Sequence, residues 1–283
     1  MPDTSISISP VLPATGPISG ASSSPASLLN LKGKRGLVVG IANASSIAYG
    51  CARAYRELGA EVAVTYLNAK AERFVRPLAE QLSSQIVLPC DVTVEGELEA
   101  VYAEIDRTWG KLDFILHSIA FAPMQDLHGR VIDCSRTGFM SAMDVSCHSF
   151  IRMAKLAEPL MEKAGGGSMQ TVSYFGADKV VEHYNMMGPV KAALESTTRY
   201  LAAQLGPKGI RVNTLSPGPL ATRAASGIDH FNDLMVKATE RAPTHHLTTI
   251  DEVGAYSAFL ATDAAKSVTG QLVYIDGGYN IIG

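Results

Sequence analysis

The sequence lacks three features that mark particular classes of protein. It has no long run of basic residues and a formal net charge of −3, so it carries no electrostatic footprint for binding nucleic acid. No apolar stretch reaches the roughly 20 residues that a membrane-spanning helix needs. Its cysteines, Cys51, Cys90, Cys134 and Cys147, show neither a CxxC pair nor the spacing of a zinc site. Such scattered cysteines indicate buried thiols in a reducing compartment, so we expect a cytoplasmic protein without a bound metal.

Residues 1–30 differ in composition from the rest of the chain. About half of them are Ser, Pro or Gly, and Asp3 is the one charged residue. Such a segment buries too little apolar surface to offset the entropy that it would lose on ordering. It has neither the basic start and long apolar core of a secretory signal nor the arginines of a mitochondrial presequence. We therefore predict a disordered Ser/Pro-rich tail over residues 1–30 and a folded domain over residues 31–283.

The folded part predicts a layered α/β domain. Hydrophobic residues make up 47% of the sequence and charged residues 18%, which suits a soluble protein with a broad buried sheet. From Lys34 onward, apolar runs typical of strands alternate with helical patterns. The strands are expected at 36–40, 61–66, 86–90, 113–119, 169–174, 211–215 and 272–275, and the helices at 46–58, 71–82, 95–109, 142–163, 189–205 and 251–261. This alternation predicts a single-domain, Rossmann-type doubly wound parallel sheet with helices on both faces.

The turn after the first predicted strand has the physical features of a nucleotide-binding site. It runs from Gly40 to Gly50 and lacks the GxGxxG pattern. Gly40 permits a tight turn, and Ser45 or Ser46 can cap the following helix and present a hydroxyl group. The exposed N–H groups at the start of that helix favour a pyrophosphate. A strand, a turn of small residues and a helix in this order therefore predict a dinucleotide cofactor.

The end of the second predicted strand bears on the choice between NADH and NADPH. An acidic residue there binds the ribose 2′-hydroxyl of NADH, whereas an arginine accepts the 2′-phosphate of NADPH. Residues 65–70 contain neither, and we interpret Lys70 as a solvated lysine at a helix start. A 2′-phosphate would therefore lack a bidentate partner. We favour NADH, and NADPH stays open as the alternative.

Further cofactor contacts are expected where the next strands end. Asp91 and Val92 follow the third predicted strand, where an adenine would rest. Ser118, Ile119 and Ala120 follow the fourth strand, at the crevice where the strand order of a doubly wound sheet reverses. His117, just before this crevice, is most simply a packed histidine.

Tyr184 and Lys191 are the strongest candidates for catalysis. A phenol and an ammonium group beside a nicotinamide suit the stabilisation of negative charge on oxygen as hydride arrives. Seven helical steps of about 100° return to within ~20° of the same face. Pro189 fits only in a first turn, so the helix should begin near residues 185–188, just after Tyr184. Met187 stands four residues before Lys191, where ketoreductases on this fold carry their tyrosine.

Several further runs, each weak alone, occur in a specific order along the chain. They are Ser46–Gly50, Cys90–Val92, His117–Pro123, Ser173–Ala177, Tyr184 with Lys191, Arg211–Asn213, Ser216–Pro219, Ala224–Gly227 and Asp276–Gly278. Together they make the sequence from about Leu31 to its end resemble the enoyl-acyl-carrier-protein reductases of bacterial fatty-acid synthesis. These enzymes are an offshoot of the short-chain dehydrogenase/reductase superfamily.

The resemblance implies an activity, a set of site residues and partners. It implies an NADH-dependent reductase that acts on enoyl chains carried by acyl carrier protein, and a homotetramer. Tyr174 and Tyr184 would be the active-site tyrosines, and Ala122 would line the substrate site. The cofactor would contact Gly40, Ser46, Ile47, Asp91, Val92, Ile119, Lys191, Leu220, Ala221, Thr222, Arg223 and Ala224. We add Leu67, Ser118 and Ala120 to the cofactor set from their positions after the second and fourth strands.

The sequence departs from the family at three places. Leu67 stands where NADH-using members often carry glutamine, and Ala120 where many have glycine. Members often have basic residues for the acidic carrier protein after the Ser-Gly-Ile run. This chain has Asp229, His230, Asn232 and Asp233 there, whereas Arg223, Lys237 and Arg241 offer another basic surface.

The chemistry of enoyl reduction assigns roles to these residues. Tyr184 would donate a hydrogen bond to the enolate oxygen that forms as hydride reaches the β-carbon. Lys191 would bind the nicotinamide ribose hydroxyls, and its charge would lower the pKa of Tyr184. Residues 217–246, rich in Ala, Ser and Gly, would form a lid. Either an acyl-chain wall or ordinary packing is expected of Met186, Met187, Phe231, Leu234 and Met235. Two alternatives are open: a carbonyl reductase or alcohol dehydrogenase on the same fold, and an inactive cofactor-binding protein.

Overall fold

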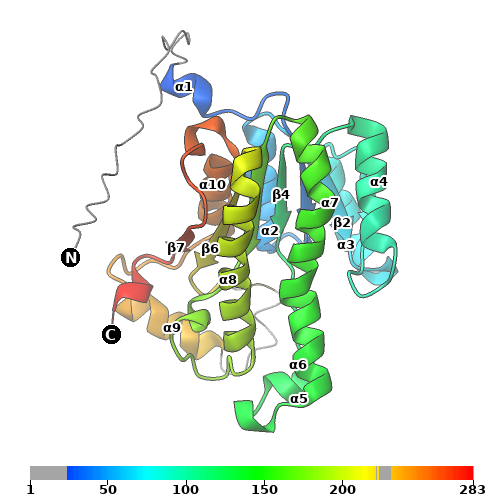
Figure 1. Cartoon of the computed structure of the whole chain (residues 1–283). Coiled ribbons are helices and arrows are strands. Elements are labelled where there is room, and N and C mark those ends of the chain that lie inside the picture. Colours follow the sequence, from blue (N-terminus) through cyan, green and yellow to red (C-terminus); the bar gives the residue numbers. More distant parts are fainter. Residues whose placement is uncertain (1–23, 221, 223–230, 283) are drawn as a thin grey trace, which may run out of the picture.

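A parallel β-sheet runs through the centre of the molecule (Figure 1). The structure, a computed structural model, describes residues 24–220, 222 and 231–282. Within this part of the chain the sheet has seven strands in the order β3-β2-β1-β4-β5-β6-β7, and every neighbouring pair is parallel. The strands are β1 Arg35–Val39, β2 Glu61–Tyr66, β3 Val87–Pro89, β4 Phe114–His117, β5 Gly167–Val172, β6 Ile210–Pro217 and β7 Leu272–Ile275. The chain order reverses between β1 and β4, which is where doubly wound sheets open a ligand crevice.

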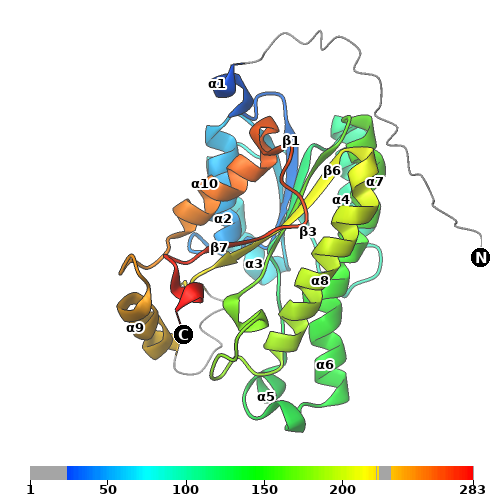
Figure 2. The same ribbon diagram turned by 60° about the vertical axis from the view of Figure 1, so that its left-hand side comes forward.

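Helices cover both faces of the sheet (Figure 1, Figure 2). On one face lie α2 Ile47–Glu57, α3 Ala69–Gln81 and α10 Ile250–Ala261, and on the other α4 Glu97–Trp109, α7 Ser149–Lys163 and α8 Met187–Leu205. The other described α-helices are α1 Pro25–Leu28, α5 Met124–Leu127, α6 Arg136–Met143 and α9 Phe231–Arg241. This arrangement confirms the predicted Rossmann-type fold.

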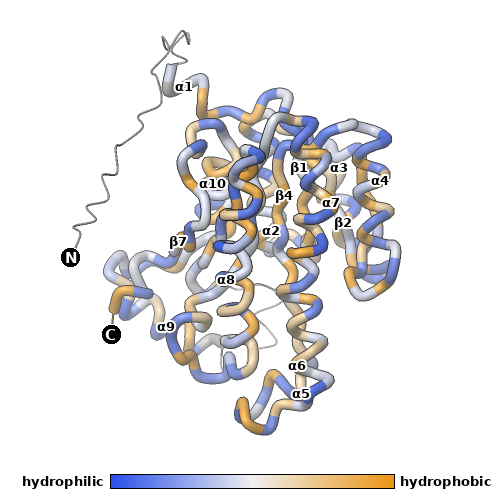
Figure 3. Tube along the Cα trace, in the orientation of Figure 1, coloured by the Kyte–Doolittle hydropathy of each residue, from blue (hydrophilic) through white to orange (hydrophobic). Residues whose placement is uncertain are grey.

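Two apolar cores hold the layers together, one on each face of the sheet. Successive residues of β1 alternate between them: Leu37 and Val39 pack against the α4, α7 and α8 side, whereas Val38 packs against the α2, α3 and α10 side. The ring centroids of Tyr55 and Phe114 lie 4.5 Å apart in the second core. Apolar stretches accordingly run through the centre of the sheet in Figure 3. Because both faces of β1 and β4 are buried, most of their residues are apolar in unbroken succession, which makes these strands predictable from the sequence.

The long helix predicted at 142–163 is wrong at its start. Helix α7 begins at Ser149, a π-helix spans Asp144–His148, and α6 precedes it without a break. Ser135 caps α6 by accepting a hydrogen bond from the N–H of Gly138 at 3.0 Å. The π-helix holds extra residues per turn, so the apolar positions of α6 and α7 do not follow one helical period along the sequence. A search for a single period therefore finds α7 and misses α6.

The start of the described chain is anchored to the domain. Helix α1 lies within the segment for which we predict a disordered tail, and residues 1–23 of that segment lie outside the described residues. Leu31 is completely buried, and its N–H donates to the carbonyl of Leu58 at 2.8 Å. Among the described helices, none has the length and apolar character to cross a bilayer.

Candidate active site

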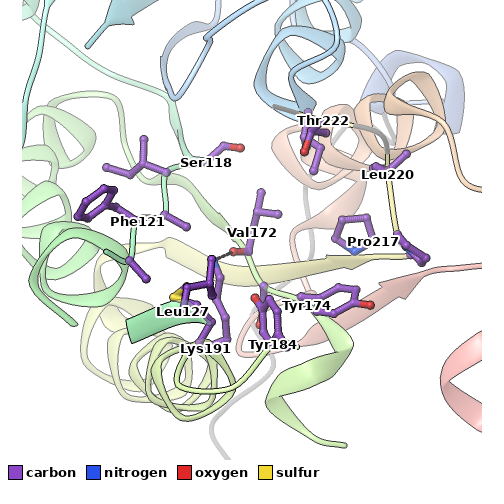
Figure 4. A pocket seen from close by; sticks show the side chains of 18 of the residues that line it. Ser118, Phe121, Leu127, Val172, Tyr174, Tyr184, Lys191, Pro217, Leu220 and Thr222 are labelled. Carbon is purple, nitrogen blue, oxygen red and sulfur yellow. Dashed lines mark hydrogen bonds between the residues drawn. The ribbon is translucent and has the colours of Figure 1, made fainter. Parts of the chain in front are cut away.

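A cavity of about 340 Å³ opens at the carboxyl edge of the sheet (Figure 4). Its walls come from the segments that follow β4, β5 and β6, from the first residue of α2, and from α5 and α8. The lining residues are Ile47, Ser118–Ala122, Met124, Leu127, Val172–Tyr174, Tyr184, Met187, Lys191, Pro217–Leu220 and Thr222. The cavity therefore lies at the strand-order reversal, where the sequence places the cofactor crevice.

Gly40 brings the turn after β1 against the chain after β4. Its φ is +119°, a conformation that side chains other than glycine rarely adopt. A Cβ atom at this position would lie 2.1 Å from the carbonyl oxygen of Ser118. Glycine is thus required here both for its backbone angle and for the close approach.

Ser46 occupies the N-cap position of α2, but its hydroxyl does not make the predicted capping bond. Its Oγ turns back into the turn and accepts hydrogen bonds from the N–H groups of Ala42 and Asn43, each at 3.0 Å. The prediction was wrong in this detail because a small-residue turn offers N–H groups that compete with those of the helix. Ser46 therefore orders the turn in front of the helix N-terminus.

Tyr174, Tyr184 and Lys191 come together in one wall of the cavity. The rings of the two tyrosines pack edge to face with their centroids 4.9 Å apart. Lys191 Nζ donates to the carbonyl oxygen of Val172 at 2.6 Å, the dashed line in Figure 4. The side chains of Tyr184 and Lys191 are buried in the fold but border the cavity. Helix α8 begins at Met187, as Pro189 predicts, so Tyr184 lies in the loop just before it.

Burial dominates the ionisation of these groups. It lowers the pKa of Lys191 to about 8, against a raising effect of Glu195. The pKa of Tyr184 is raised by burial and, to a smaller extent, by Tyr174 and Glu195. The expected lowering of the Tyr184 pKa by Lys191 is not seen in this structure, because the loss of hydration raises this pKa. Tyr184 keeps its hydroxyl proton at neutral pH, as a hydrogen-bond donor must.

Tyr184 is held between two residues with left-handed backbones. The φ angles of His183 and Asn185 are 64° and 43°. The amide Nδ2 of Asn185 also donates to the carbonyl of Leu127 at 2.7 Å, which ties the loop of Tyr184 to α5. Asn tolerates the left-handed region better than most residues. Asn185 therefore fixes the position of Tyr184 both through its backbone and through its side chain.

Two substitutions at Asn185 separate these contributions. Asn185→Gly keeps access to the left-handed backbone and removes the tether, at a cost of about 1 kcal/mol in the free energy of unfolding. Asn185→Ala removes both, and we expect a further loss of about 1 kcal/mol. Urea unfolding of the two variants measures the difference. If the Ala variant is as stable as the Gly variant, the backbone contribution is absent.

His117 is a packed histidine, as expected. It is completely buried, with Nδ1 at 2.8 Å from Thr171 Oγ1 and Nε2 at 2.9 Å from Ser149 Oγ. Burial, with a further contribution from Lys191, lowers its pKa to about 3, so the ring is neutral at physiological pH. Beside it, Ser146 Oγ of the π-helix accepts from the N–H of Phe121 at 3.0 Å and holds the segment after β4.

The remaining candidate residues fall into three groups. Ile47, Ser118, Ile119, Ala120, Ala122, Leu220 and Thr222 line the cavity. Gly40, Ser46, Leu67, Asp91 and Val92 follow the ends of β1, β2 and β3 at the same edge of the sheet and are outside the cavity lining. Ala221, Arg223 and Ala224 lie outside the described residues. Asp91 is held by its own turn, because its Oδ1 accepts from the N–H and hydroxyl of Thr93 at 2.9 and 2.7 Å.

The expected acyl-chain wall is only partly correct. Met187 lines the cavity, but Met186 is completely buried behind it, and Leu234 and Met235 of α9 are outside the cavity lining. The side chain of Phe231 lies outside the described part of the structure. The apolar wall comes instead from α5 and the segment before it, through Phe121, Met124 and Leu127. Sequence reasoning missed α5 because four residues are too few to show a helical period.

Comparison with known proteins places the chain in a family. Residues 40–280 match the family model described as enoyl-(acyl carrier protein) reductase. The chain belongs to this family. It is 45% identical over 253 residues to the enoyl-[acyl-carrier-protein] reductase [NADH] FabI of Aquifex aeolicus, which covers 89% of this chain and 93% of the relative. It is 42% identical over 252 residues to the enzyme of the same name from Escherichia coli, covering 89% and 95%.

Solved structures of similar proteins share the fold. The reductase of Anaplasma phagocytophilum, crystallised in complex with NAD, has a TM-score of 0.86 and 42% identity, covering 90% of this chain and 97% of that one. The Bacillus cereus enoyl-acyl carrier protein reductase, crystallised with NADP⁺ and an indole naphthyridinone, also has a TM-score of 0.86, with 43% identity and coverage of 89% and 98%. The family thus includes structures with either form of the cofactor.

Proposed function

We propose that this protein reduces the trans-2 double bond of enoyl thioesters, with hydride from NADH, in fatty-acid biosynthesis. The observation that carries the proposal is the meeting of Tyr184 and Lys191 in one cavity at the strand-order reversal. Met187, four residues before Lys191, places a thioether where a ketoreductase has its tyrosine. Membership of the enoyl-(acyl carrier protein) reductase family supports the same reaction.

The residues of the cavity fit a dinucleotide. Gly40 keeps the turn before α2 free of a side chain, and the edge beside it is formed by the small residues Ser118 and Ala120. Lys191 carries three N–H donors, of which one goes to Val172, so two stay for the ribose hydroxyls. When bound, the cofactor supplies the hydride. We assign the rest of the binding edge to Ser46, Ile47, Leu67, Asp91, Val92, Ile119, Leu220, Ala221, Thr222, Arg223 and Ala224.

The protein's own contribution to the reaction is electrostatic. Negative charge develops on the thioester oxygen as the β-carbon is reduced, and the protonated hydroxyl of Tyr184 stabilises it by donating a hydrogen bond. Lys191 keeps a positive charge close to this oxygen. Tyr174 packs against the ring of Tyr184 and forms the adjoining wall, so it orients that ring and contacts the substrate. Ala122 lines the substrate side of the cavity.

The wider setting is also a proposal. We propose that the substrate arrives on acyl carrier protein and that residues 31–283 act as one reductase domain. We further propose that residues 217–246, of which 221 and 223–230 lie outside the described residues, close over the bound substrate. We propose a homotetramer that works in the cytoplasm. NADH is favoured over NADPH because Leu67, half exposed after β2, offers a 2′-phosphate no charged partner.

One assay matrix tests the proposed reaction. The loss of absorbance at the nicotinamide band is followed with NADH or NADPH against crotonyl and acetoacetyl thioesters, each on acyl carrier protein and on coenzyme A. We expect the fastest turnover with NADH and a crotonyl thioester. Faster reduction of the acetoacetyl substrates would make the protein a carbonyl reductase. Binding of NADH without turnover of any thioester would make it an inactive cofactor-binding protein.

A further inference from the structure

A buried carboxyl group lies directly behind the catalytic wall. Glu195 is on α8, one helical turn after Lys191, and its side chain is 9% exposed. The hydroxyl of Ser173 donates to Glu195 Oε1 at 2.5 Å. Ser173 is itself buried and borders the cavity. A carboxyl group is rarely buried to this degree without a partner or a role.

The end of β5 makes three successive contacts with the catalytic elements. The carbonyl of Val172 accepts from Lys191, the hydroxyl of Ser173 donates to Glu195, and the ring of Tyr174 packs on Tyr184. Neighbouring residues of one strand end thus contact two successive turns of α8 and the loop just before it. A shift of Glu195 relative to Ser173 would therefore disturb the contacts of Lys191 and of the ring of Tyr184.

We infer that Glu195 is a positioning residue of the reductase: through Ser173 it fixes the strand end that holds Lys191 and Tyr184. This inference rests on the proposed function. The inference also gives Ser173 a structural role, because its hydroxyl already donates its hydrogen to the carboxyl group of Glu195. Ser173 is then a poor donor to a ketone carbonyl, in line with an enoyl rather than a carbonyl substrate.

The charges around Glu195 and Lys191 decide whether loss of the Glu195 charge raises or lowers the pKa of Lys191. Burial lowers the pKa of Lys191 to about 8, and Glu195 is the largest influence that opposes this. The pKa of Glu195 is itself raised by burial and lowered by Ser173, Arg199 and Lys191. The titratable groups that face the pair from the surrounding elements are His117, Cys147, Asp178, Tyr184, Arg199 and Tyr274. Loss of the negative charge at residue 195 removes a contribution that raises the pKa of Lys191, so Lys191 then loses its proton at a lower pH.

The test is the pH dependence of Glu195→Gln, which keeps the shape and the acceptor oxygen but removes the charge. For crotonyl thioester reduction between pH 6 and 10, we expect the alkaline fall of kcat/KM to begin about one pH unit lower than in the unmodified protein. The dissociation constant of NADH, titrated by fluorescence without substrate, should begin to rise at the same lower pH. The control is Glu80→Gln, an exposed carboxyl on α3, which should reproduce the profile of the unmodified protein.

Three outcomes are distinguishable. Superimposable profiles for Glu195→Gln and the unmodified protein overturn the inference. An unmodified protein without turnover contradicts the proposed function, and the NADH titration then still tests the charge relation between Glu195 and Lys191. If Glu195→Gln does not fold, Ser173→Ala replaces it: the carboxyl group stays but loses its bond to the strand end, so kcat/KM should fall several-fold across the whole pH range, and an unchanged kcat/KM overturns the inference.

Discussion

Tyr184→Phe is expected to lower kcat for a crotonyl thioester by about 10²–10³-fold, the usual effect of removing one donor to a developing oxyanion. The variant keeps the ring, and with it the edge-to-face contact with Tyr174. The position of Lys191 does not depend on the phenol, because its nitrogen is bound to Val172. NADH affinity should therefore change little, so the loss should appear in kcat rather than in cofactor binding.

The matched control is Tyr200→Phe, which removes the same hydroxyl from an exposed position on α8. It should have the kcat of the unmodified protein. Stopped-flow measurement of a single turnover separates the hydride step from product release. Normal single-turnover rates in Tyr184→Phe would show that another group stabilises the charge, and Tyr174, whose hydroxyl is also buried at the cavity, would be the next to substitute.

Lys191→Met is expected to reduce kcat/KM by about 10³-fold, because two charge-assisted hydrogen bonds, each worth about 1.5–3 kcal/mol, are lost from the cofactor. The dissociation constant of NADH should rise in parallel, in contrast to Tyr184→Phe. Lys266→Met is the matched control, since it removes an exposed ammonium group from a residue outside the cavity lining. NADH binding by Lys191→Met at normal affinity would contradict the assignment of Lys191 to the ribose.

The same variant should not be less stable than the unmodified protein. The pKa of Lys191 falls from 10.5 in the unfolded chain to about 8 in the fold. Keeping its charge buried thus costs about 3 kcal/mol below pH 8. Between pH 8 and 10.5 the unfolded state holds the proton that the folded state has released, so this cost falls as the pH rises. Urea unfolding of the cofactor-free proteins at pH 7 and 9.5 checks this: the gain in stability on raising the pH should be smaller in Lys191→Met. An equal gain in both would show that Lys191 is not desolvated.

The sheet could be predicted from the sequence because its physical cause is local. Strands such as β4 are buried on both faces, and a run of apolar residues between turns has few other interpretations. The pairing of Tyr184 with Lys191 was equally accessible, since Pro189 fixes where α8 can begin. The position of Gly40 was also predictable, although the contact with Ser118 that makes glycine necessary is visible only in three dimensions.

The features that could not be predicted from the sequence depend on competition between contacts. The Ser46 hydroxyl could accept from the N–H groups of the turn or from those of the helix start, and it accepts from those of the turn. The pKa of Tyr184 depends on how far the fold removes its hydroxyl from water. The spacing of residues along the sequence does not show this burial. The apolar wall from α5 depends on contacts between residues far apart in the chain, such as the hydrogen bond from Asn185 to the carbonyl of Leu127.

The π-helix Asp144–His148 holds a surplus residue that the fold could lose. A π turn holds about one residue more than an α turn, so it takes up this residue while α6 and α7 keep their faces. Deleting one residue from the π-helix would let the helix become regular with little rotation of α6. Deleting one residue from α7 would instead swing α6 by about 100° around the common axis. Ala142, now packed in the cluster that includes Tyr184, would then face elsewhere. Homologous chains should therefore tolerate single-residue deletions in this turn far better than in the first turns of α7.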